Sequence, residues 1–548
     1  MPLADGGSPA TATGLVPPSA APGVRRSVPA RVWLVVALFL GVMLCQTAIF
    51  PHARSPDERR HVDLVLQVRT GTAWPWPGPG QLTVTEGTRG GAFLPDDRIE
   101  GRQHLADRDD IPPRGDRQSY LDAGGTGHSG AEGPEPLNQL VQHPPLYYVL
   151  GAGVVSLIPQ WETAPFDQVW MVLRWWNALL MAPLPLLLWA ISRRLGLPDP
   201  LPFAAAMLPL AVPELTHLAS AVNNDNLLIM LVAVATLFVV RVLTGDLSRV
   251  TAVGLGVVTS LALLTKGFAL MIPVWVGLAY LVAGLRFRRP TALVSLLVAW
   301  AVSLPGIAWW VRNRVVYGLV QPHGTHTEPP ELTAVFGWSD GGSAWLARLG
   351  DRLVTLYFVQ DHAALMRQDA SWWMSRVALG LIVVGVVVTL VRRNLPRADA
   401  LVLLLPTLAL AAIVAKGSWE QFAAYQNIRA GQQGRYLYSG MAALLPVALA
   451  GAARLTGAAR RAVPLGVLVL AAAVHAAFQY DTWWLYWLPE DGSGLGAWGR
   501  AAQAVAHLYP FPTPVLVTIV VATAALAVTV VVVAVAVLRD RELRRRDA

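Results

Sequence analysis

The sequence predicts an all-α polytopic membrane protein with about twelve transmembrane helices. Of its 548 residues, 54% are hydrophobic and only 14% are charged, and the mean hydropathy is +0.45. Apolar runs long enough to cross a bilayer as helices recur along the whole chain. The net charge of +8 comes with arginine clusters between these runs. Such clusters are typical of cytoplasmic anchors facing anionic lipid and do not indicate a nucleic-acid partner.

The chain is expected to begin with a disordered cytoplasmic tail. Residues 1–29 are rich in Pro, Ala and Gly, a composition that does not support a packed core. The first apolar run, 30–50, lacks a convincing small-residue cleavage site, so we expect a retained helix and not a signal peptide. Cys45, the single cysteine, lies inside this run. An intrachain disulfide is therefore excluded, and a thiol metal site is implausible.

A long polar loop follows the first predicted helix. Residues 51–142 are rich in Gly, Pro, Asp and Arg, and this length is unusual for a connection between helices. A short apolar segment, 143–158, closes the loop. Clear spans are then expected near 167–191, 199–217, 226–243, 249–265, 267–285, 291–310, 373–391, 399–415, 436–453, 463–480 and 513–538.

The charges indicate that 143–158 does not cross the membrane. If it crossed, the number of crossings would be odd and the two termini would lie on opposite sides. Arg25-Arg26 and the basic tail 539–548 both favour the cytoplasm, however. The segment's apolar core is also shorter than the roughly 20 residues that a spanning helix needs, and Pro144-Pro145 suits a helix start. We therefore expect an interfacial helix at 143–158, lying in or dipping into the outer surface.

This topology places nearly all polar residues on the outer side of the cell membrane, with both termini in the cytoplasm. An active site should therefore be extracytoplasmic. The expected organisation is a catalytic transmembrane module at 30–310 with the extracytoplasmic loop 51–142, a second such loop at 311–372, a C-terminal transmembrane module at 373–538 and the cytoplasmic tail 539–548.

Asp57 and Glu58 are the first candidate catalytic residues. They follow the first span directly, where an acidic pair close to hydrocarbon is costly without a purpose. The alternative is an ordinary helix start, with Ser55 as N-cap and Pro56 in the first turn. On a helix, His61 would share a face with Asp57. The two could hold a divalent metal or share a proton.

Asp225 is the second candidate carboxylate. It lies in Asn223-Asn224-Asp225-Asn226, between two apolar helices and on the predicted outer face. The alternative is an Asx-type turn in which Asn226 or Asp225 caps the next helix. Glu214 and His217, a few turns earlier, favour a functional role because acidic and imidazole groups near the end of a span are expensive.

Lysine usage gives a further indication. Among 43 Lys and Arg residues only Lys266 and Lys416 are lysine, and a glycine follows each. Both end an apolar helix on the predicted outer face, against the positive-inside tendency. A compact ammonium group there suits a phosphate held at the membrane surface. The alternative is a lysine that extends its ammonium group from a helix end to the interface.

Arginines beside aromatic residues complete the candidate substrate-binding groups. Arg435 and Tyr436 open one span from the outer side, and Arg312 closes another. Aromatic residues at this level commonly form an interfacial belt, but the arginines could clamp a phosphate or diphosphate. No phosphate-binding Walker loop, dinucleotide fingerprint, His-Glu-x-x-His or Gly-x-Ser-x-Gly motif occurs in a suitable context. The sequence thus predicts neither ATP hydrolysis nor serine-type catalysis.

The order of these features resembles the GT-C glycosyltransferases, which include the protein O-mannosyltransferases and the bacterial enzymes that add aminoarabinose to lipid A. The resemblance spans roughly 30–450. It depends on Pro56-Asp57-Glu58 with His61, His143-Pro144-Pro145-Leu146-Tyr147-Tyr148, Asp225, and Leu264-Thr265-Lys266-Gly267. Related transferases carry a lysine where this chain has His143. The most similar pattern is a bacterial membrane-protein group without an assigned substrate, whose elements match the surroundings of Asp225, Arg312-Asn313 and Arg435.

The resemblance implies an inverting sugar transfer at the outer face. Asp57 would be the general base for an acceptor hydroxyl of a glycan, lipid or protein, and the donor would be a sugar on polyprenyl phosphate within the membrane lipids. Lys266, Lys416 or Arg435 would stabilise the leaving phosphate. Glu58, His61 and Asp225 would orient substrate or hold a divalent metal.

Two other classes stay open. About twelve spans with both ends inside also suit a transporter or lipid flippase, although the halves show no internal repeat. A polymerase or ligase of surface glycans, using diphosphate-linked donors, is the third class. In the transferase, Asp57, Asp225 and at least one lysine should meet in one outer cavity, whereas a transporter would hold its charges near mid-membrane.

Overall fold

The structure is a computed structural model that describes residues 27–91, 101–127, 137–324, 334–358, 369–428, 430–492 and 494–540. Most of the predicted tails 1–29 and 539–548, and parts of the predicted loop 311–372, lie outside these residues. The described residues form helices joined by turns, with two isolated β-bridges and no strand. The predicted all-α class is confirmed.

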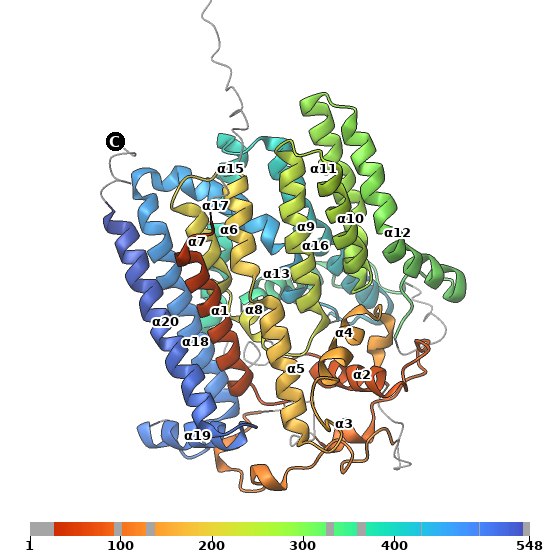
Figure 1. Ribbon diagram of the computed structural model, residues 1–548, viewed down its shortest axis with the longest axis vertical. Helices are drawn as coiled ribbons and strands as arrows, with labels where there is room; N and C mark the ends of the chain where they lie inside the picture. Colours follow the sequence, from red (N-terminus) through yellow and green to blue (C-terminus); the bar gives the residue numbers. More distant parts are fainter. Residues whose placement is uncertain are drawn as a thin grey trace, which may run out of the picture.

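Ten helical segments in the described chain are long and apolar enough to cross a membrane, or eleven if one bent pair counts as a span. They pack side by side as one bundle (Figure 1). The single helices are α1 (Ala30–Ile49), α9 (Asn224–Leu243), α12 (Thr291–Tyr317), α15 (Asp369–Arg392), α16 (Arg397–Tyr425) and α20 (Thr513–Arg539). The composite ones are α5 (Phe166–Met181) with α6 (Leu184–Arg194), η5 (Gly267–Met271) with α11 (Ile272–Phe287), η7 (Gly434–Gly440) with α17 (Met441–Thr456), and η8 (Gly457–Ala462) with α18 (Val463–Tyr486).

The two remaining predicted spans are irregular helices. The predicted span 199–217 consists of α7 (Leu201–Met207), η4 (Leu208–Ala211) and α8 (Pro213–Ala219), with a bend of 71° between η4 and α8. Pro213 at the start of α8 cannot donate a backbone hydrogen bond to the preceding turn. α10 (Arg249–Leu263) is short because the chain leaves the helix before Lys266, whose backbone is extended. Every predicted span is therefore helical, and these two irregular helices account for the lower count.

The predicted interfacial segment forms α4 (Leu146–Val155), a helix of 10 residues that starts directly after Pro145. At 1.5 Å per residue it is too short to cross hydrocarbon about 30 Å thick. It packs on α2 (Glu58–Thr70), and both lie with α3 (Glu86–Gly90) at one end of the bundle (Figure 1). The end of α20 lies at the opposite end.

The described parts of the first polar loop, 51–91, 101–127 and 137–142, are folded onto this end of the bundle. Asp63 on α2 is fully buried and accepts hydrogen bonds from the backbone and hydroxyl of Thr85, from Asn138 and from Gln67. Farther along the loop, Arg102 donates to backbone carbonyls that precede α19 (Leu495–Leu508). Arg114 donates to carbonyls in its last turn and directly after it. Hydrogen bonds thus join the first and last polar loops.

Candidate active site

A polar cavity with about 650 Å³ of empty space lies where the first loop meets the bundle. Its wall comes from the start of α2, from η3 (Gln139–Gln142), from the start of α9, from η5 and from η7. The lining residues are Asp57, His61, Gln139, Leu140, Gln142, His143, Asn223, Asp225, Lys266, Gly267, Phe268, Gln321, Arg435 and Tyr436. Seven of the ten residues that the sequence singled out are among them.

Asp57 presents a carboxylate to this cavity. Its side chain is 33% exposed, and its Oδ2 lies 3.5 Å from Nη2 of Arg435. The residue stands directly before α2, but its side chain makes no capping hydrogen bond. The alternative with Ser55 as N-cap and Pro56 in the first turn is also wrong, because α2 begins at Glu58. Its backbone has a φ of 57°, a left-handed conformation that persists in a non-glycine residue only where the surroundings hold it.

Glu58 points away from the cavity and is fully buried. Its carboxylate accepts two hydrogen bonds from Arg174, at 2.7 and 2.6 Å, and one from the backbone of Val222 at 3.1 Å. Arg174 also donates to the carbonyl oxygens of Thr47, Phe50 and Pro51. This arginine ties the end of α1 to the start of α2. Arg174 lies inside a predicted span, where a charged residue usually has a buried partner, and the sequence analysis did not use this indication.

Asp225 and Lys266 form a buried ion pair in the cavity wall, with 2.6 Å between Oδ1 and Nζ. Asn223, and not Asp225, caps α9, because its side-chain oxygen accepts from the backbone nitrogen of Asp225. The Tyr436 ring lies between two cations, with its centroid 5.4 Å from Nζ of Lys266 and 5.4 Å from the guanidinium carbon of Arg435. Such contacts orient the cations.

His61 and His143 are buried at the cavity, and burial is the largest cause that lowers the pKa of each well below its ordinary value. The positive charge of Lys266 acts in the same direction on both. His61 Nδ1 lies 3.2 Å from the hydroxyl of Tyr148, whereas His143 Nδ1 is buried and makes no hydrogen bond to any residue that the structure describes. Two neutral imidazoles therefore face the cavity at neutral pH.

Lys416 and Arg312 lie outside this cavity. Lys416 is exposed on α16 and pairs with Glu420 at 2.5 Å. Arg312 is exposed near the end of α12, over the rings of Trp309 and Tyr317. Among the described residues there is no group of three or more His, Cys, Asp or Glu that could hold a metal ion.

The carboxamides in the cavity wall were not predicted. Gln139 and Gln142 lie on η3, and Gln321 lies far along the sequence, after α12. Isolated glutamines carry no pattern that would single them out. Carboxamides offer both donors and acceptors, which suits the hydroxyl groups of a sugar.

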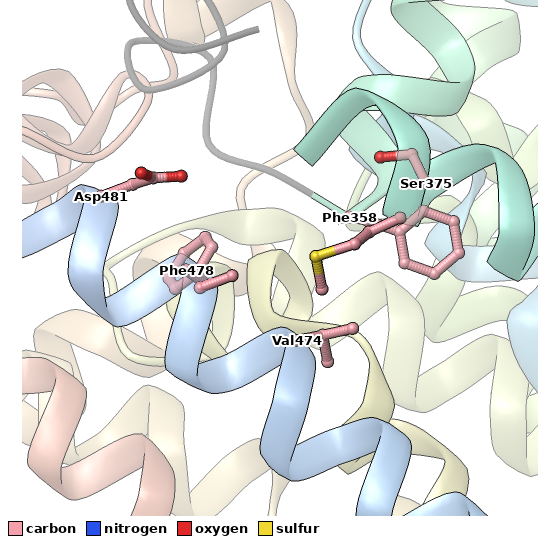
Figure 2. Close-up of a pocket in the computed structure, with 7 residues that line it drawn as sticks. Phe358, Ser375, Val474, Phe478 and Asp481 are labelled. Atoms are coloured by element: carbon pink, nitrogen blue, oxygen red, sulfur yellow. The ribbon is translucent and has the colours of Figure 1, made fainter. Parts of the chain in front are cut away.

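A second, mostly apolar cavity lies between α18, α15 and the end of α13 (Gly342–Phe358) (Figure 2). Val474 and Phe478 of α18 line it opposite Phe358. The Phe478 ring also lies 6.3 Å from the ring of His217.

A family model described as dolichyl-phosphate-mannose-protein mannosyltransferase matches residues 142–309. The matched segment is shorter than half of the chain, and it includes His143, Asp225 and Lys266 of the cavity. The match confirms the predicted resemblance to the GT-C glycosyltransferases.

Three solved structures of low sequence identity are similar to this chain. ArnT from Cupriavidus metallidurans, bound to undecaprenyl phosphate, is 14% identical, with 88% of this chain and 77% of that chain covered and a TM-score of 0.41. The apo oligosaccharyltransferase of Archaeoglobus fulgidus is 13% identical, with 90% and 56% covered and a TM-score of 0.37. AglB from Archaeoglobus fulgidus, with an inhibitory peptide and a dolichol-phosphate, is 14% identical, with 91% and 56% covered and a TM-score of 0.33. None of the curated proteins matches the sequence.

Proposed function

We propose that this chain is a membrane glycosyltransferase of the GT-C type, which moves a sugar from a polyprenyl-phosphate donor to an acceptor hydroxyl. The observation that carries the proposal is the meeting of Asp57, Asp225, Lys266 and Arg435 in one cavity. They come from four distant parts of the sequence. This is the convergence expected of a transferase, and the match of residues 142–309 to a mannosyltransferase family model points to the same chemistry.

In the proposed reaction, the Asp57 carboxylate removes the proton of the acceptor hydroxyl as its oxygen attacks the anomeric carbon. The bond between that carbon and the phosphate oxygen breaks, the phosphate keeps the electron pair, and the configuration at the carbon inverts. The proton then passes from Asp57 to water. A well-placed general base typically contributes about 10²–10⁴-fold.

The cations of the cavity would stabilise the leaving phosphate. Lys266 is buried and held by Asp225, and Arg435 is buried beside Asp57. Fixed cations in a water-poor site act strongly on charge that develops in the transition state. The neutral His143 would add a hydrogen-bond donor or acceptor. Glu58, through its ion pair with Arg174, would hold residues 55–58, which we call the Asp57 segment.

The arginine distribution supports an extracytoplasmic site. α9 begins at the cavity beside Asp225 and has Arg241 in its last turn. η5 with α11 begins beside Lys266 and has Arg286 in its last turn. The cavity end and the arginine end are thus opposite ends of the same helices. Arginine-rich ends favour the cytoplasm. The charges at the cavity also lie at helix starts and not at mid-span, which argues against the transporter alternative.

The decisive test is transfer by the purified Asp57→Asn protein. Synthetic polyprenyl-phosphate sugars would be supplied as donors, with membrane glycans, lipids and peptides as acceptors. We expect wild-type protein to transfer sugar and the variant to be slower by about 10²–10⁴-fold with its fold intact. Normal transfer by Asp57→Asn would remove the proposed base, and no transfer by the wild type with any donor would contradict the proposed function itself.

A further inference from the structure

Ser55 is hydrogen-bonded to a histidine that comes from a distant helix. Its Oγ lies 2.9 Å from Nε2 of His217, and the Nδ1 of that ring lies 3.0 Å from Oε2 of Glu214. All three side chains are buried. In the tautomer that carries its proton on Nδ1, the ring donates to the Glu214 carboxylate, and its Nε2 accepts from the Ser55 hydroxyl. A directional chain of hydrogen bonds thus runs from α8 to the residue two before Asp57.

The His217 ring is fixed on its other faces as well. It stacks on Phe50 with a centroid separation of 3.7 Å, and Phe478 packs at 6.3 Å. Phe478 also lines the apolar cavity of Figure 2. The bend of 71° before α8 brings Glu214 and His217 under the Asp57 segment. A straight continuation of α7 would have carried them along the bundle axis.

The Asp57 segment is held on both sides. Ser55 is bound by His217 before Asp57, and Glu58 is bound by Arg174 after it. Between them, the Pro56 carbonyl accepts from the Asn223 side chain at 3.3 Å. Only the Asp57 side chain is left to face the cavity, and its backbone has the left-handed φ of 57°. Such a conformation in a non-glycine residue needs support from its neighbours.

We infer that Ser55, His217 and Glu214 are positioning residues that fix the Asp57 carboxylate relative to the acceptor. The expected effect on transfer kinetics rests on the proposed function. The expectation that these three residues hold the backbone around Asp57 does not. The three side chains resemble a nucleophile, base and acid in series, but Ser55 does not line the polar cavity. Its hydroxyl is therefore used as a hydrogen-bond donor that holds the chain.

This inference predicts which kinetic constant changes. A displacement of about 1 Å in a catalytic group can cost about 10²-fold in rate. Loss of the Ser55 hydroxyl should therefore lower kcat by about 10–100-fold. The KM for the donor should stay within about twofold, because the cations proposed to hold the donor, Lys266 and Arg435, do not contact Ser55 or His217.

The experiment compares four full-length variants. Ser55→Ala removes the hydroxyl, and Ser55→Thr keeps one. The double variant His217→Phe with Glu214→Leu replaces both polar partners by apolar groups, so that no buried carboxylate is left unpaired if single His217 variants do not fold. Ser192→Ala is the matched control, because Ser192 is a fully buried serine on α6, remote from the cavity, whose Oγ makes no hydrogen bond.

Two measurements are made on each variant, hydrogen exchange of the 55–61 backbone and transfer kinetics. We expect exchange in 55–61 to rise by about tenfold or more in Ser55→Ala and in the double variant, while Ser192→Ala matches the wild type. kcat should fall in the same two variants, and Ser55→Thr should restore it.

Unchanged hydrogen exchange of 55–61 in both Ser55→Ala and the double variant would overturn the inference. Faster exchange with an unchanged kcat would overturn it as well. If the wild type transfers no sugar, the proposed function fails instead. The exchange comparison then still decides whether His217 and Glu214 hold this segment.

Discussion

The ammonium group of Lys266 lies 2.6 Å from the carboxylate of Asp225, and both side chains are buried in the wall of the polar cavity. The pair joins the start of α9 to the extended residue before η5. A second contact, from Nζ to the side-chain oxygen of Asn224 at 3.4 Å, fixes the ammonium group further. Lys266 is therefore an oriented cation at the cavity and not a lysine extended into solvent.

Replacing this cation should weaken catalysis strongly. We expect Lys266→Met to lower the transfer rate by about 10²–10³-fold, because a fixed cation would no longer meet the charge on the leaving phosphate. Lys266→Arg keeps the charge but changes its geometry, so it should be intermediate. Initial rates against donor concentration measure both effects.

Lys416→Met is the matched control, since Lys416 is exposed and paired with Glu420 outside the cavity. Its transfer rate should stay within about twofold of the wild type. A Lys266→Met protein as active as Lys416→Met would contradict the proposed role of Lys266.

The two lysines also show how far sequence reasoning reaches. Both had the same local signal, a rare lysine before glycine at a predicted outer helix end. That signal marks a place in the membrane but says nothing about which residues meet across the bundle. Lys266 meets Asp225 only because the chain leaves α10 early, and Lys416 has no such break because α16 continues to Tyr425.

Hydropathy and charge were sufficient for the spans and for the short helix at 143–158, because these patterns are local. The ion-pair partner of Glu58 could not be predicted from such local patterns. Arg174 lies 116 residues away, and only the packing of α5 against α1 brings it to the carboxylate. The same holds for Gln139 and Gln321, whose place in the cavity depends on loops that carry no periodicity.

The buried pair of Glu58 and Arg174 should be a major source of stability. Arg174→Met leaves the buried Glu58 carboxylate without its cation and three backbone carbonyls without their donor, so we expect a loss of about 3–5 kcal/mol in the free energy of unfolding. Glu58→Gln keeps a hydrogen-bond acceptor and should cost less. Chemical unfolding in detergent, followed by tryptophan fluorescence, measures the difference.

Arg193→Met provides the comparison for this prediction. Arg193 pairs with Asp199 at 3.5 Å, and both side chains are over a third exposed, so its loss should cost no more than about 1 kcal/mol. An Arg174→Met protein as stable as Arg193→Met would show that the buried pair is not needed for the fold.

Asp63 should hold the first loop on α2. Its carboxylate accepts four hydrogen bonds in a fully buried position. Asp63→Asn replaces one accepting oxygen by a donor, which opposes the donors around it and should cost about 1–3 kcal/mol. Limited proteolysis should then cut within 51–142 faster than in the wild type. Equal cleavage rates for Asp63→Asn and for a variant of the exposed Asp110 would contradict this prediction.

Stability should fall as the pH drops below about 6.5, the ordinary pKa of a histidine. Burial is the largest cause that lowers the pKa values of His52, His61 and His143 in the folded protein. Below pH 6.5 the unfolded chain therefore binds protons at these positions that the folded chain does not, and the free energy of unfolding decreases as pH falls.

Each such histidine contributes a slope of up to about 1.4 kcal/mol per pH unit. His143→Gln should remove the part of the pH dependence of the free energy of unfolding that comes from His143. This position suits the test because His143 Nδ1 makes no hydrogen bond to the described residues that the substitution would break. Unfolding midpoints measured from pH 8 to 5.5 report this slope, and Asp63, whose pKa burial raises, acts in the opposite direction. A wild-type protein with the same midpoint across this range, or a His143→Gln protein with an unchanged slope, would show that these imidazoles are protonated within the fold.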